Sequence, residues 1–96
     1  MSQYLATYDV SHDRQRERVA RVLERYGERI QKSVFLVWLR PDDMPDLRRE
    51  IGSLLHRDDA FDLLPVDERG TRRRVTWQRP VANQPVIVID DVAEIP

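Results

Sequence analysis

Apolar residues recur along the chain with two different periods, and each period predicts a different kind of element. Residues 4–8 form a short stretch rich in strand-forming side chains, which favours a β-strand. Farther on, apolar side chains at i, i+3, i+4 and i+7 predict one face of a helix of about 13 residues. These side chains are Val19, Val22, Leu23 and Tyr26. Ser11 or Asp13 is expected to cap the start of this helix, and Gly27 to take the position after its end.

The next part of the chain predicts strand, helix and strand again. Residues 29–39 favour extended structure, either as one long strand or as two strands joined by a tight turn near Lys32 and Ser33. A second amphipathic helix is predicted to begin near Asp43. Its apolar positions are Met44, Leu47, Ile51, Leu54 and Leu55. Residues 56–60 are expected to be a loop, and residues 61–66 a strand that Pro65 favours at a sheet edge.

Beyond this strand the pattern becomes weaker. Residues 68–70 predict a turn, residues 73–77 a short strand, and residues 86–89 a last strand after a proline-bounded segment. The order β-α-β(β)-α-β predicts an α+β protein, a ferredoxin-like βαββαβ sandwich with two helices on one face of a mainly antiparallel sheet. We expect residues 1–79 to form this domain, and residues 80–96 a linker and a strand that pairs with a sheet edge of its own chain or of a partner.

Composition and charge narrow the class of protein. The 96 residues, of which 41% are hydrophobic, predict one domain. The absence of cysteine excludes disulfides, thiolate zinc sites, iron–sulfur clusters and a cysteine nucleophile. No apolar run approaches the ~20 residues of a membrane span, and the start does not resemble a secretion signal. We therefore expect a cytoplasmic protein that does not enter a membrane.

Basic residues form two blocks, although 16 basic and 17 acidic residues nearly cancel. Arg14, Arg18, Arg21 and Arg25 form a stripe on the first predicted helix, and Arg16 falls on its other flank. Such a stripe can follow a phosphate backbone, although it is also typical of a solvated face held by pairs such as Glu17 and Arg21. A second block without interleaved acids follows at Arg69, Arg72, Arg73, Arg74 and Arg79. The two blocks together favour nucleic-acid binding.

Asp9 is the candidate for metal chemistry. It stands at the carboxyl end of the first predicted strand, immediately before a helix, where a carboxylate can hold a divalent cation. One carboxylate makes a poor magnesium site, whereas two copies across a dimer axis would make a better one. The alternative is that Asp9 only turns the chain. The two histidines, His12 and His56, stand in different predicted loops and lack the spacing of metal ligands.

Several of these residues also form a pattern that resembles a known family. The segment 8–11 with Arg16 and Arg18, followed by residues 26–35 that read YGERIQKSVF, is similar to the CRISPR-associated protein two family, the small partner of the CRISPR integrase. The match is close over roughly the first 40 residues. The chain departs from the family at His12, where an acid is common, and at residues 36–38, where a polar residue is frequent.

The resemblance implies a homodimer with two strands broken near Lys32 and with C-terminal strands that cross to the other protomer. It implies that the two Asp9 side chains face the dimer axis and share Mg²⁺. The positions carried over by motif match include Tyr8 with Asp9 as catalytic residues, Arg29 as a nucleic-acid contact, and Phe35 in a structural or dimer role. The partners implied are the integrase and duplex DNA or RNA.

Two functions stay open from the sequence. In the first, the dimer is an adaptor that binds duplex DNA and bridges integrase dimers during spacer acquisition. In the second, it is a magnesium-dependent endonuclease, in which Asp9 holds the metal and arginines neutralise phosphate charge. A toxin-type metal-dependent endoribonuclease on the same fold is the alternative to both.

Overall fold

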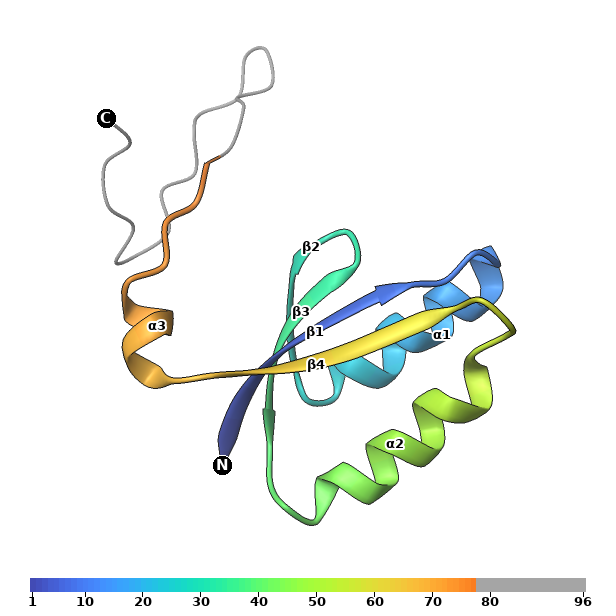
Figure 1. The fold of residues 1–96 in the computed structure, drawn as a ribbon, viewed down its shortest axis with the longest axis horizontal. Coiled ribbons are helices and arrows are strands. Elements are labelled where there is room, and N and C mark those ends of the chain that lie inside the picture. The colour runs from blue at the N-terminus through green and yellow to red at the C-terminus, as the bar shows by residue number, and fades with distance from the viewer. Residues whose placement is uncertain (78–96) are drawn as a thin grey trace. The chain divides into compact units, whose positions relative to one another are not determined.

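A four-stranded sheet with two helices forms the first part of the computed structural model, which describes residues 1–77 (Figure 1). The elements of this part are β1 Ser2–Asp9, α1 Asp13–Glu24, β2 Gly27–Gln31, β3 Val34–Leu39, α2 Asp43–Leu54 and β4 Ala60–Val66. The strand order is β2-β3-β1-β4, and every neighbouring pair is antiparallel. This is the predicted ferredoxin-like α+β fold. The sequence left open whether residues 29–39 form one long strand or two. The structure has two strands, β2 and β3, on either side of a turn at residues 32–33.

The core lies between one face of the sheet and the two helices. Alternate residues of β1 and β3 point into it, and Phe35, Leu23, Leu39 and Leu47 are among its largest fully buried side chains. Because successive side chains of a strand point to opposite faces, the intervening residues of β1 and β3 line the other face of the sheet. Neither α1 nor α2 covers that second face, which we call the open face.

Gly27 does not end the first helix as predicted; it begins β2. The last turn of α1 tightens instead, with the N–H of Tyr26 donating to the carbonyl of Leu23 at 2.9 Å, so no left-handed residue is needed. The N–H of Trp38 in turn donates to the carbonyl of Tyr26 at 3.0 Å, which starts the pairing with β3 directly after the helix. A Cβ on Gly27 would lie 1.9 Å from the carbonyl oxygen of Leu36. Glycine is therefore required here by the close approach of two strands.

The predicted caps of the first helix were wrong as well. The residue at the cap position of α1 is His12, and its side chain makes no capping hydrogen bond. Ser11 does not cap the helix because its hydroxyl donates to Oδ1 of Asp59 at 3.1 Å, in the loop that precedes β4. A contact across 48 residues thus replaces the local cap that the sequence favoured.

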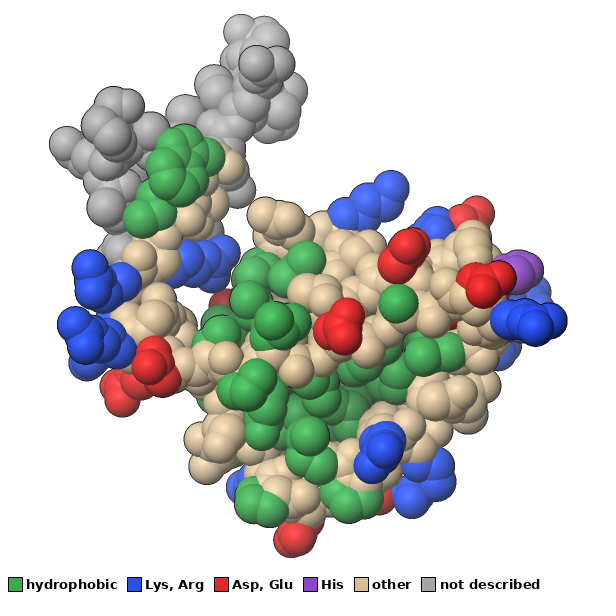
Figure 2. Space-filling view, viewed as in Figure 1, with side chains coloured by type: hydrophobic (Ala, Val, Ile, Leu, Met, Phe, Trp, Pro, Cys, Tyr) green, Lys and Arg blue, Asp and Glu red, His purple; other side chains and the backbone are tan. Residues whose placement is uncertain are grey.

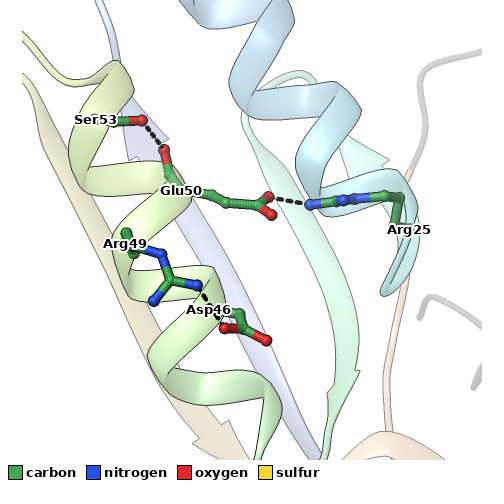
Figure 3. A network of polar contacts seen from close by, with 5 residues as sticks. All are labelled: Arg25, Asp46, Arg49, Glu50 and Ser53. Carbon is green, nitrogen blue, oxygen red and sulfur yellow. Dashed lines mark hydrogen bonds and ion pairs between the residues drawn. The ribbon is translucent and has the colours of Figure 1, made fainter.

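An ion pair joins the two helices on their outer surface (Figure 3). The guanidinium of Arg25, just after α1, binds the carboxylate of Glu50 on α2. On α2 itself, Arg49 pairs with Asp46 at 2.7 Å. Exposed pairs of this kind contribute little to stability, about 0–1 kcal/mol each, but Arg25 is thereby occupied within the fold.

A second unit begins at Asp67. It contains α3, Glu68–Arg72, whose first turn replaces the turn predicted at residues 68–70. The side chain of Asp67 caps this helix by accepting from the N–H of Gly70 at 2.6 Å. Residues 74–77 carry no regular secondary structure, so the strand predicted at residues 73–77 is wrong. The predicted strand at 86–89 and the predicted boundary after residue 79 lie outside the described residues.

Within residues 1–77, no helix has both the length and the apolar character required to cross a bilayer.

Candidate nucleic-acid interface and metal site

The open face of the sheet carries a row of leucines across three strands. Leu5 on β1 pairs in register with Leu36 on β3 and with Leu64 on β4. Leu64 is 49% exposed, which is unusual for a large apolar side chain in the middle of a strand. Leu5 is half-buried and Leu36 is buried, so the exposed part of the row is at Leu64. Exposed apolar surface of this kind is suited to contact with another protein surface.

Asp9 lies on the same face, at the end of β1. Side chains two or four residues apart on a strand point to the same face, so Asp9 lies on the same face as Leu5 and on the opposite face from Tyr8. Its neighbour on β4 is Ala60. Its side chain is exposed, and the carboxylate makes no hydrogen bond or ion pair within residues 1–77. It is therefore available to a ligand or to a partner surface.

A single chain does not supply a magnesium site at Asp9. Among residues 1–77 there is no group of three acidic or histidine side chains that could hold a metal ion. Mg²⁺ prefers six oxygen ligands, and one carboxylate leaves five to water or phosphate. The donor set fits the ion better when a second carboxylate comes from another copy of the chain.

The structure separates Tyr8 from Asp9, although they are adjacent in sequence. Tyr8 is only 6% exposed and lies in the core under the helices, with its hydroxyl donating to the carbonyl of Lys32 at 3.4 Å. Its ring also contacts that of Phe35, with centroids 6.3 Å apart. The geometry therefore gives Tyr8 a packing role, and its catalytic role stays a prediction.

Phe35 and Arg29 form one local unit. Phe35 is fully buried on β3, and the guanidinium carbon of Arg29 lies 5.2 Å from the centre of its ring, a cation–π arrangement. Arg29 itself is exposed on β2. The core thus orients this arginine on the surface, where a phosphate could reach it. Its nucleic-acid contact and the dimer role of Phe35 stay predictions.

The arginines of α1 divide into paired and unpaired side chains. Arg16 donates to the carbonyl of Val10 at 3.1 Å and pairs with Asp13, so it holds the start of the helix against the end of β1. Arg25 is held by Glu50. Arg14 makes no ion pair or side-chain hydrogen bond within residues 1–77, and Arg18 makes only a 3.4 Å contact with Gln15. The predicted pair of Glu17 and Arg21 is not formed in this part of the chain, which leaves a basic surface for an anionic partner.

The second basic block belongs to the unit that starts at Asp67. Arg72 lies 3.8 Å from Glu68, one helical turn away on α3, and Arg73 and Arg74 follow the helix. All three are only partly buried or exposed. Their contact with nucleic acid stays a prediction.

Two loops that the sequence analysis treated separately meet beside Asp9. The stacked imidazole rings of His12 and His56 have centroids 4.6 Å apart and an interplanar angle of 29°. Sequence spacing could not reveal this pair, because 43 residues lie between the two histidines. The strand topology explains why the two histidines meet. Because β1 and β4 are antiparallel neighbours, the loop after β1 and the loop before β4 lie at the same end of the sheet.

The carboxylate of Asp59 connects these two loops. Its pKa is held below the ordinary value, first because it accepts a hydrogen bond from the N–H of His56 at 2.8 Å, and then because it accepts from Ser11. Partial desolvation opposes this shift. Because folding lowers the pKa of this carboxyl, the connection stabilises the fold above the unfolded-state pKa. That contribution is lost as the pH falls through the folded-state pKa.

The fold and its open face define a ferredoxin-like domain with an exposed carboxylate at the end of its first strand. Comparison with known proteins then identifies the family. The family described as CRISPR associated protein Cas2 matches residues 1–74. The chain therefore belongs to the Cas2 family.

Individual relatives agree with this assignment. The chain is 34% identical to the CRISPR-associated endoribonuclease Cas2 4 of Rhodospirillum rubrum, over 93% of this chain and 75% of that protein. It is 41% identical to the CRISPR-associated endonuclease Cas2 2 of Thermus thermophilus, over 66% of this chain and 71% of that protein.

Solved structures agree as well. Cas2 of Streptococcus pyogenes shares the fold, with a TM-score of 0.73 and 24% identity over 79% of this chain and 99% of that one. A chain of a partial Cas6-RT-Cas1–Cas2 complex has a TM-score of 0.70 and 27% identity, over 93% of this chain and 99% of that one.

Proposed function

We propose that this chain acts in CRISPR adaptation, in the cytoplasm, as a homodimer that binds duplex DNA and bridges dimers of the integrase. The observation that carries the proposal is the likeness, over nearly its whole length, to a chain of a complex that contains Cas1 and Cas2. The open face and the unpaired arginines of α1 supply the two surfaces that such an adaptor needs, one for a second copy and one for a phosphate backbone.

The homodimer is supported by the leucine row and by the edge of the sheet. Burial of apolar surface such as Leu64 stabilises an interface by roughly 25 cal/mol per Å². Among the described residues β4 pairs only with β1, so its outer backbone can accept a further strand from a second copy. A dimer through the open face would also bring the two Asp9 carboxylates toward one axis.

Replacing Leu64 by aspartate is expected to convert the dimer to a monomer and to abolish assembly with integrase and a short duplex. The charge would sit at the end of the leucine row, on the edge strand β4, where burial of an unpaired carboxylate in the dimer interface is strongly unfavourable. The measurement is light scattering of the purified chain alone, and then of its mixture with integrase and duplex.

The matched control places the same charge elsewhere. Ser53→Asp changes an exposed residue of α2, away from the open face, and should leave both the dimer and the assembly intact. Circular dichroism establishes that each variant is folded. A folded Leu64→Asp variant that remains dimeric contradicts the proposed interface, and a wild-type chain that does not assemble with integrase and duplex contradicts the adaptor function.

Duplex binding is expected to depend on the unpaired arginines of α1 and not on the paired one. Arg14→Ala should weaken binding and reduce the slope of log affinity against log salt by about one for each phosphate that the variant no longer neutralises. Arg25→Ala is the matched control, because its guanidinium is already held by Glu50. Fluorescence anisotropy with a labelled duplex at several salt concentrations measures the affinity and the salt slope of each variant. Equal slopes for wild type and Arg14→Ala would mean that this arginine is only a solvated helix residue.

A metal-dependent endonuclease is the second candidate function. It is favoured by the exposed, unpaired carboxylate of Asp9 and by the names of the relatives, which include an endonuclease and an endoribonuclease. In this proposal, Asp9 from each of two copies would hold Mg²⁺, which, when bound, acts as a Lewis acid toward phosphate. Arg29 and the α1 arginines would neutralise phosphate charge. A toxin-type endoribonuclease would share this site but not the assembly with integrase.

A further inference from the structure

The stacked side chains of His12 and His56 lie at the surface of the sheet domain. His12 comes from the loop after β1 and His56 from the loop after α2, and both side chains are exposed. Figure 2 shows histidine at the surface, among basic and acidic side chains, at the end of the sheet where β1 leads into α1. Ring nitrogens placed here are accessible to an ion from solvent.

The backbone on both sides of the pair is held by one carboxylate. Oδ2 of Asp59 accepts from the N–H of His56 at 2.8 Å, while Oδ1 accepts from the N–H and the hydroxyl of Ser11 at 3.3 and 3.1 Å. Ser11 directly precedes His12. These hydrogen bonds hold together the two loops that carry the imidazoles, and the orientation of the rings themselves is set by their stacking.

We propose that His12 and His56 together bind a divalent transition-metal ion of the class that prefers imidazole, such as Zn²⁺. Zinc–imidazole bonds are about 2.1 Å long, so tetrahedral coordination places two ligating nitrogens about 3.4 Å apart. The centroids of the two exposed rings are 4.6 Å apart, and the rings would rotate out of their stacked arrangement so that one nitrogen of each is directed at the ion. Water completes the coordination, because the described residues offer no third histidine or acidic ligand in a metal-binding group.

This site is distinct from the magnesium that we propose at Asp9. Imidazole nitrogen suits zinc, copper and nickel, whereas Mg²⁺ takes oxygen ligands. The histidine site lies within one chain and does not need a dimer. Because a bound ion would connect the loop after β1 to the loop before β4, it would stabilise the folded chain by mass action. The carboxylate of Asp59, ionised at neutral pH, adds negative charge close to the cation.

The test is zinc binding by isothermal titration calorimetry with the full, tag-free chain. Wild type is expected to bind zinc saturably, with one ion per chain, and to melt at a higher temperature when zinc is present. His12→Asn and His56→Asn should each abolish the saturable binding and the thermal shift. Asp59→Asn should weaken binding by about 10-fold, because the loops that carry the ligands lose part of their connection.

Asp9→Asn is the matched control, and zinc binding should be unchanged in it. Circular dichroism without metal shows whether each variant keeps the fold, which the exposure of both histidines favours. Saturable binding that survives in either histidine variant, or that is missing from the wild type, overturns the proposal. Loss of zinc binding in Asp9→Asn would also overturn it, since the ion would then belong to the Asp9 site. Failure of the zinc site leaves the dimer and DNA experiments unaffected.

Discussion

Replacing Gly27 by alanine is expected to destabilise the fold by about 3 kcal/mol or more. The added Cβ would lie 1.9 Å from the carbonyl oxygen of Leu36, 2.8 Å from its carbonyl carbon and 2.7 Å from Cα of Val37. All three are backbone atoms of β3, so no side-chain rotation can relieve the overlap. The strands β2 and β3 would have to separate, which weakens their hydrogen bonds and moves Arg29 relative to Phe35.

Gly52 provides the matched control for the same substitution. It lies within α2, and a Cβ there would have no neighbour within 4 Å. Gly52→Ala should therefore stabilise the protein by about 0.5–1 kcal/mol, since alanine favours a helix interior over glycine. Urea denaturation of both variants measures the difference. Equal stability of Gly27→Ala and wild type would contradict the close approach of β2 and β3.

If the chain is the proposed magnesium-dependent endonuclease, Asp9→Asn is expected to abolish cleavage, while the proposed dimer and its assembly with duplex and integrase persist. Asparagine keeps the size of the side chain but removes the charge that would hold the metal. The carboxylate makes no hydrogen bond or ion pair within residues 1–77, so its removal should leave folding stability nearly unchanged. Cleavage is followed with labelled RNA and duplex DNA, and assembly by light scattering.

Asp62→Asn is the matched control for this variant. Asp62 is also an exposed carboxylate on the open face, paired in register with Thr7 on the neighbouring strand. The Asp62→Asn variant should cleave RNA or duplex DNA as the wild type does. Undiminished cleavage by Asp9→Asn, in preparations free of contaminating nuclease, would remove Asp9 from the mechanism. A folded dimer of Asp9→Asn that no longer assembles would instead make this carboxylate part of the surface that supports DNA.

Much of the fold could be predicted from the sequence because its signals are local. The helical spacing of Val19, Val22 and Leu23 predicts the buried face of α1, and Pro65 is at the edge strand where a missing N–H is tolerated. The order of elements sufficed for the ferredoxin-like architecture. Two elements after β4 were predicted wrongly. Residues 68–70 were predicted as a turn but belong to the short helix α3, which the side chain of Asp67 caps, and residues 73–77 were predicted as a strand.

The candidate sites depended more on tertiary structure. The sequence by itself identified Asp9 as an exposed carboxylate candidate and α1 as a basic helix, because charge and strand ends are visible in one dimension. It could not distinguish Arg14, which is unpaired within residues 1–77, from Arg25, whose partner Glu50 lies on another helix. Nor could it show that Gly27 faces a backbone carbonyl of β3.

The stacked histidines illustrate the physical reason for this division. Periodicity records which side of one element is buried, since that depends on residues three or four apart. Contacts such as that of His12 with His56, or of Ser11 with Asp59, arise only when antiparallel pairing of β1 and β4 brings two loops to one end of the sheet. The sequence therefore determined the elements and their apolar faces, whereas the topology of the sheet decided which polar side chains meet.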